Sequence, residues 1–147
     1  MRPLARRPRI PRVLRYAEIS RADPSVVWTL LARPDRWSAW APHVRGAWHL
    51  GSPQVREGAR GAARLMGVIP VPARITAVDP GRSWTWQVGP VSMRHTVDPA
   101  PQGSEVGVTL MSSGPVEAVL AKTYGPIVQL LVTRLARVAE ERVTVGP

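Results

Sequence analysis

The chain of 147 residues contains no cysteine, no phenylalanine and only two tyrosines. The absence of cysteine excludes disulfide bonds, thiolate catalysis and cysteine-ligated zinc or iron–sulfur sites. No apolar run approaches the roughly 20 residues that a membrane-spanning helix needs. Acidic residues are also scarce, at 10 against 20 basic residues. The length and a hydrophobic fraction of 44% fit one domain with one packed core.

Much of the positive charge lies at the start of the chain. Six arginines and no acidic residue occur among the first fifteen positions, and three prolines interrupt any helix there. We expect residues 1–12 to form a disordered basic arm and residues 13–147 to form a single domain. The arm suits contact with phosphate groups or peripheral contact with anionic lipids, and a solvated extension without a partner fits the same residues.

The basic residues are almost all arginine, with Lys122 the one lysine. This bias is typical of a GC-rich genome, so the net charge of +10 is weak evidence for a nucleic-acid partner, and we expect none. Arg6 and Arg7 are not followed by the apolar segment of a twin-arginine signal. We therefore expect a cytoplasmic protein.

A strand and two short helices are predicted to open the domain. Leu14–Arg21 alternates between polar and apolar residues, as a half-buried strand does. Asp23 followed by Pro24 favours a helix start, because Asp accepts a bond from an unpaired amide and Pro has no amide to leave unpaired. We expect this helix to end at Ala32, and a second short helix with two tryptophans to begin at Pro34.

Six further strand candidates are separated by turns that contain glycine and proline. Such short connections favour an antiparallel meander. Parallel strands would need crossover helices, for which the chain has no room. The candidates are Val44–Leu50, Ala59–Met66, Val71–Val78, Ser83–Val88, Val91–Val97 and Glu105–Met111.

The last predicted element is a long helix. From Val116 to about Arg142, apolar residues recur at alternating intervals of three and four, with a kink expected at Pro126. The element order predicts an α+β fold in which a seven-stranded curved antiparallel sheet wraps around a long C-terminal helix, with two short helices between strands 1 and 2. One helix cannot fill the concave face of a twisted sheet, so we expect a cavity between them.

Few side chains are available for chemistry in such a cavity. Each carboxylate has a place in a turn, a helix cap or a solvent-facing position, which argues against a carboxylate-driven enzyme. The three histidines are dispersed along the chain, so we expect no metal site and no cofactor. His95 alternates with apolar residues of its strand, where a neutral imidazole can accept a hydrogen bond or act as a general base. A structural histidine with a backbone partner fits the same position.

Large apolar side chains are expected to complete the cavity wall. Trp40 and Trp86 are the candidate ligand contacts among the six tryptophans, whereas Trp28 and Trp37 fit core anchors better. His95 is the candidate catalytic residue. The full set of expected ligand-binding residues is Trp40, His43, Met66, Trp86, Met93, His95, Ser112, Tyr124, Val128 and Leu131.

Five short motifs follow one another along the chain. They are Asp23-Pro24 before Val27-Trp28, Pro34-Asp35-x-Trp37-x-x-Trp40-x-Pro42, Ile75 to Arg82, Val97-Asp98-Pro99, and Ser113-Gly114-Pro115. Together, over roughly Val13 to Val143, they resemble the START-like (SRPBCC, helix-grip) superfamily of the polyketide cyclase/dehydrase type. The resemblance implies a helix-grip fold with a deep hydrophobic cavity for a lipid, polyketide or other apolar molecule, and many members of this superfamily only bind or carry.

Three functions are therefore open at this point. The first is binding of a small apolar molecule in the internal cavity, as a carrier or binding protein. The second is a metal-free cyclase- or dehydratase-like lyase that uses His95, and the third is an interaction protein that uses the basic arm. We expect a monomer or a dimer. A second polar group close to His95 would favour the enzyme, and a wall of only apolar side chains would favour the carrier.

Overall fold

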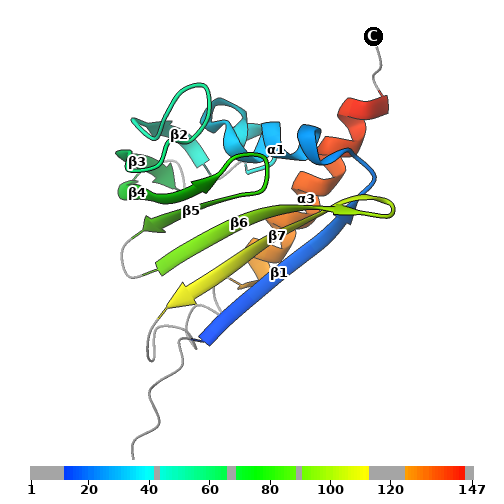
Figure 1. Cartoon of the computed structure of the whole chain (residues 1–147). Helices are drawn as coiled ribbons and strands as arrows, with labels where there is room; N and C mark the ends of the chain where they lie inside the picture. Colours follow the sequence, from blue (N-terminus) through cyan, green and yellow to red (C-terminus); the bar gives the residue numbers. More distant parts are fainter. Residues whose placement is uncertain (1–11, 42–43, 66–68, 89–90, 113–124, 145–147) are drawn as a thin grey trace, which may run out of the picture.

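The computed structural model describes residues 12–41, 44–65, 69–88, 91–112 and 125–144. These residues form a curved antiparallel sheet with a long C-terminal helix behind it and two short helices at one end (Figure 1). The helices are α1 (Pro24–Ala32), the 3-10 helix η1 (Pro34–Ala39) and α3 (Gly125–Thr144). The strands are β1 (Arg12–Ser20), β2 (Val44–Trp48), β3 (Arg60–Leu65), β4 (Ile69–Asp79), β5 (Ser83–Val88), β6 (Val91–Ala100) and β7 (Gly103–Ser112).

The seven strands lie in the order β1-β7-β6-β5-β4-β3-β2, and every neighbouring pair is antiparallel. The meander runs from β2 to β7, and β1 then pairs with β7. The predicted fold class is thereby confirmed. Strand β1 begins at Arg12, the last residue assigned to the basic arm, and the rest of that arm lies outside the described residues.

The β6–β7 turn depends on Gly103, which has a φ of 145°. A Cβ atom at this position would lie 2.6 Å from the backbone oxygen of Ser20. Any larger residue would therefore clash with the end of β1 as well as strain the backbone. This close approach lets the hairpin pack against the point where β1 turns into α1.

The core lies between the concave face of the sheet and the helices. Alternate residues of β7, such as Val106 and Val108, are buried on this face, and Val132 and Leu135 are buried on the facing side of α3. The predicted helix is described only from Gly125, because residues 113–124 lie outside the described part. The kink expected at Pro126 depends on residues before Gly125 and therefore stays a prediction.

Strand β1 is joined to α3 by polar contacts between residues that are more than 100 positions apart in the sequence. Ser20, fully buried, donates from Oγ to the carbonyl of Ala136 at 2.9 Å. Glu18 accepts from the Thr133 hydroxyl and from Arg137, both at 3.3 Å. The inner face of β1 is thus its more polar face.

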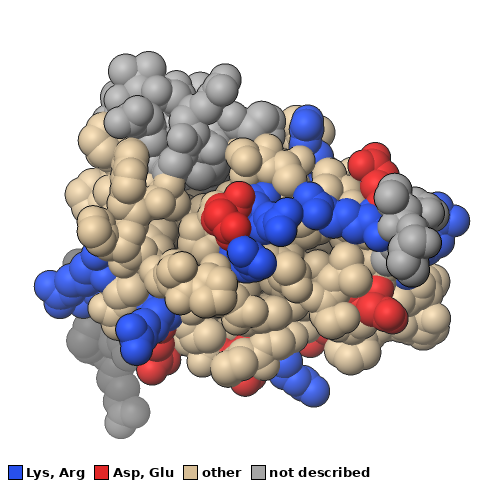
Figure 2. Space-filling model, turned by 90° about the horizontal axis from the view of Figure 1, so that it is seen from above, with Lys and Arg blue, Asp and Glu red and all other residues tan. Residues whose placement is uncertain are grey.

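Charged side chains gather outside this core. Figure 2, seen from the side of α1, shows basic residues in a row with acidic residues beside them. Described ion pairs include Arg33 with Asp35 and Arg137 with Glu140, both at 2.8 Å. Among the described residues, no helix is long and apolar enough to span a membrane.

Candidate ligand pocket

A partly open pocket lies between the sheet and α3, next to η1, and it encloses a cavity volume of about 50 Å³. Its wall combines aromatic residues from η1 and β5 with aliphatic residues from α3. Among the described residues, those that line the pocket are Leu31, Trp37, Trp40, Ala41, Trp84, Trp86, Met93, His95, Val108, Val128, Leu131, Val132 and Leu135.

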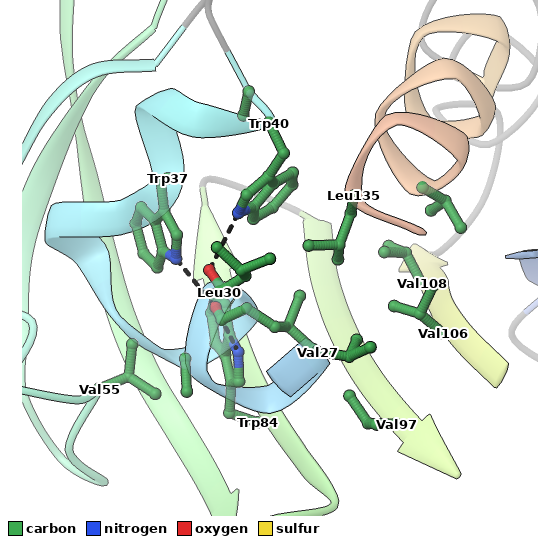
Figure 3. Packing of buried hydrophobic residues seen from close by; sticks show 14 of the residues in the cluster. Val27, Leu30, Trp37, Trp40, Val55, Trp84, Val97, Val106, Val108 and Leu135 are labelled. Atoms are coloured by element: carbon green, nitrogen blue, oxygen red, sulfur yellow. Dashed lines mark hydrogen bonds between the residues drawn. The ribbon is translucent and has the colours of Figure 1, made fainter. Parts of the chain in front are cut away.

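Three of the four lining tryptophans are fixed by the end of α1 (Figure 3). Trp37 and Trp84 donate from Nε1 to the carbonyl of Leu31, at 2.9 and 3.1 Å. Trp40 donates from Nε1 to the carbonyl of Leu30 at 2.9 Å. Carbonyls in the last turn of a helix lack partners within the helix, so the indole N–H groups supply them. The same bonds hold the aromatic wall in place.

The indole rings also pack on one another. Trp37 stacks on Trp84 with ring centroids 5.4 Å apart, and Trp86 meets both rings edge-on. His95, directly opposite Trp84 in the β5–β6 register, stacks on it at 3.8 Å with an interplanar angle of 13°. The four rings form one rigid aromatic side of the pocket.

His95 is buried within this aromatic side, with 6% of its surface exposed. Its Nδ1 lies 3.3 Å from the carbonyl oxygen of Trp84. A carbonyl only accepts, so Nδ1 carries the proton and Nε2 is left as an acceptor. Burial disfavours the charged imidazolium and lowers the pKa of His95 to about 4, and the hydrogen bond to Trp84 offsets this only in part. The side chain is therefore neutral near pH 7.

Trp86 differs from the other three tryptophans of the wall. Its Nε1 is buried and has no hydrogen-bond partner among the described residues. Its ring centroid is 6.0 Å from that of His95, with the two planes at 73°. The described wall thus holds one unpaired donor group, on a ring that meets the ring of His95 edge to face, and the other described lining residues around this pair are apolar or have their polar atoms bonded.

Six of the expected binding residues line the pocket: Trp40, Trp86, Met93, His95, Val128 and Leu131. Ser112 is buried at the end of β7 but is not among the lining residues. The pocket contacts this strand at Val108, four residues before Ser112. His43, Met66 and Tyr124 lie outside the described residues.

Sequence reasoning missed several lining residues that the alternation of the strand could have revealed. Trp84 and Trp86 are two residues apart in β5, so they share one face of the sheet. Trp37, expected as a core anchor, is both an anchor and part of the wall. Its position follows from the η1 turn and from its bond to Leu31, neither of which leaves a periodic signal.

The cavity is far smaller than the roughly 300–1,000 Å³ of typical ligand pockets. The aromatic side is held by hydrogen bonds and stacking, so it has little freedom to retreat. Met93 and Leu131 are only partly buried, and a methionine side chain adapts readily to a new shape. These two side chains are the parts of the wall best able to move.

Comparisons with known proteins agree with this architecture. Protein NE0264 from Nitrosomonas europaea is 14% identical and superposes with a TM-score of 0.72, over 88% of this chain and 95% of that one. Protein BH1534 from Bacillus halodurans is 12% identical with a TM-score of 0.70, over 88% and 97% of the two chains. At such identities the likeness shows the fold alone, and no curated protein matches the sequence.

The family comparison covers nearly the whole described chain. The matching family model is that of polyketide cyclase / dehydrase and lipid transport, and it spans residues 12–140. That range runs from the first residue of β1 into the last turns of α3, and so includes every element that builds the pocket. The chain belongs to the polyketide cyclase/dehydrase and lipid transport family.

Proposed function

We propose that this protein binds a small apolar molecule in the pocket between the sheet and α3, and acts as a binding or carrier protein. The observation that carries the proposal is a cavity on the concave face of the sheet whose described lining residues are almost all apolar. Transfer of an apolar molecule from water into such a site is favourable in proportion to the area removed from water. The description of the family, which includes lipid transport, supports the same class of ligand.

The second polar group beside His95 is the Trp86 N–H, which only donates a hydrogen bond and does not transfer protons, so the electrostatics of the wall favour binding over lyase chemistry. His95 is the one titratable side chain among the described lining residues. With a pKa of about 4 its imidazole is a weak base at neutral pH, whereas efficient general bases titrate near the working pH. Its Nδ1 partner is a backbone carbonyl rather than a carboxylate. We therefore assign His95 to ligand orientation in this proposal, and not to proton transfer.

Entry of a ligand requires the wall to open. A cavity of about 50 Å³ is too small for a lipid- or polyketide-sized molecule, since typical ligand pockets measure roughly 300–1,000 Å³. We propose that Met93 and Leu131 turn outward when the ligand enters, while the bonded tryptophans keep their places. The space available to the ligand then increases only on the side of the pocket formed by Met93 and Leu131.

Native mass spectrometry of the protein purified from its own host tests this function. The wild-type protein is expected to carry a co-purifying apolar molecule. Val128→Phe, which fills the pocket from α3, should abolish the adduct, because Val128 is 3% exposed and lines the cavity. Leu130→Phe is the matched control, since Leu130 lies on the same helix with 65% of its surface exposed.

The control should retain the same adduct mass as the wild type. A wild-type protein without any apolar adduct, or an adduct that persists in Val128→Phe, would contradict binding in this pocket. Thermal unfolding of each variant shows whether the substitution has left the fold intact.

A further inference from the structure

The unpaired indole N–H of Trp86 has no structural use within the described residues. The other three tryptophans of the wall each donate to a carbonyl of α1, whereas Trp86 Nε1 is buried and finds no acceptor. Buried donors in folded proteins are almost always paired, because burial without a partner costs the full desolvation of the group. A donor that is left over in a ligand pocket therefore points to an acceptor on the ligand.

His95, in the same pocket, provides a hydrogen-bond acceptor. Its Nδ1 is engaged with the Trp84 carbonyl, which leaves Nε2 as a lone-pair acceptor. No described residue donates to this nitrogen, and the ring lies edge-to-face with Trp86 at a centroid distance of 6.0 Å. A lone-pair acceptor and an unpaired donor on two neighbouring rings of one pocket suit a ligand group that can serve both.

Few chemical groups meet both requirements without a charge. An ether or a ketone accepts from an indole but has no proton to give to an imidazole. A carboxylate has no proton either, and none of the described lining residues carries a positive charge to offset its burial. A hydroxyl oxygen accepts and donates at once, with hydrogen bonds of about 2.7–3.0 Å on each side.

We propose that the ligand is an uncharged apolar molecule with a hydroxyl group, which accepts from Trp86 Nε1 and donates to His95 Nε2. This inference rests on the proposed function, because it names the polar group of the molecule bound in that pocket. The hydroxyl fixes the orientation of the ligand, and the aliphatic residues of α3 surround the remainder. The two hydrogen bonds then select ligands that carry a hydroxyl group, and burial of the apolar part of the ligand supplies most of the affinity.

Three small aromatic probes test the proposal on the wild-type protein. Phenol donates and accepts, anisole only accepts, and toluene does neither. Dissociation constants come from NMR titration at pH 7. Transfer out of water costs more free energy for phenol than for toluene, so phenol binds more weakly than toluene in a pocket without polar partners. We expect phenol to bind at least as tightly as toluene and about tenfold more tightly than anisole.

Variants locate the two hydrogen bonds. Trp86→Phe removes the donor and His95→Phe removes the acceptor, and each keeps an aromatic ring in the wall. The ratio of the toluene to the phenol dissociation constant should fall about tenfold in both variants. Trp40→Phe is the matched control, because that indole N–H is already bonded to Leu30 and its removal should leave the ratio unchanged.

The outcomes separate this inference from the proposed function. Binding of toluene without a preference for phenol, or a preference that survives in Trp86→Phe, would overturn the hydroxyl assignment and leave the binding function intact. Failure of all three probes to bind the wild type would contradict the binding function itself, and the hydroxyl assignment with it. If a variant does not fold, as judged by circular dichroism, the three probes on the wild type decide the matter alone.

Discussion

His95 is the residue whose environment most strongly decides what the pocket can do. Its ring is buried against Trp84, and no carboxylate faces it among the described lining residues. The alternation of its strand indicated an inward side chain, and the structure adds the backbone partner that the sequence could not specify. Burial has lowered the pKa of His95 from near neutrality into the acidic range.

The depressed pKa of His95 predicts a loss of stability in acid. The unfolded side chain titrates near 6.5 and the folded one at about 4, so the unfolded state binds more protons between these values. The contribution of the neutral, buried His95 to the free energy of unfolding is fully present above pH 6.5 and declines as the pH falls towards 4. It amounts to about 3 kcal/mol in the free energy of unfolding.

Urea unfolding of the wild type and of His95→Phe between pH 4 and pH 8 measures this effect. The wild type should lose about 3 kcal/mol more than the variant over the interval from 6.5 to 4. Parallel stability curves for the two proteins would show that His95 is not buried in its neutral form.

At the scale of elements, the end of α1 and the aromatic wall depend on each other. The Leu31 carbonyl accepts from two indoles, Trp37 and Trp84. Removal of either donor leaves the carbonyl bonded to the other, and only removal of both leaves it without a bond from an indole. This shared acceptor predicts that the two tryptophans do not act independently.

A double-mutant cycle tests the shared acceptor. Trp37→Phe and Trp84→Phe keep aromatic rings for stacking but lose the N–H groups. The double variant should be less stable than the sum of the single effects by about 1 kcal/mol, because the buried carbonyl is then unpaired. Chemical denaturation measures the four free energies of unfolding, and strict additivity would contradict the shared role of Leu31.

The elements themselves could largely be predicted from the sequence, because their signals are local. Asp23-Pro24 marks the start of α1, although the Asp23 side chain does not make the expected capping bond, and the glycine and proline turns mark the strands. The inner face of β1 was not predictable, since Glu18 and Ser20 are satisfied by residues of α3 more than 110 positions away. The indole bonds to Leu30 and Leu31 were hidden for the same reason, as carbonyl acceptors leave no trace in a sequence.

At the scale of the whole molecule, the fold leaves an unfilled space where the sequence predicted one. A curved sheet and a single covering helix explain why a cavity exists, and its size depends on side-chain packing that no periodic pattern encodes. The cavity is consequently smaller than the deep one that the family resemblance implied. The proposed binding function therefore requires the pocket to widen as a ligand enters.

Leu131→Ala tests the cost of that widening. The substitution enlarges the cavity in advance, so it should lower the free energy of unfolding by about 2 kcal/mol and tighten the binding of toluene severalfold. Leu130→Ala, on the exposed side of α3, should change neither quantity appreciably. Thermal unfolding and toluene titration supply both measurements. Toluene binding that weakens in Leu131→Ala would contradict a pocket that must open at this residue.

The most direct test of the central claim is a toluene titration that is followed through the six indole N–H signals in a nitrogen–proton NMR spectrum. Four tryptophans line the pocket, whereas Trp28 and Trp48 do not. We expect saturable shifts for the four lining tryptophans, with the signals of Trp28 and Trp48 nearly unmoved. Shifts confined to Trp28 or Trp48, or no saturable shift in any indole, would contradict ligand binding between the sheet and α3.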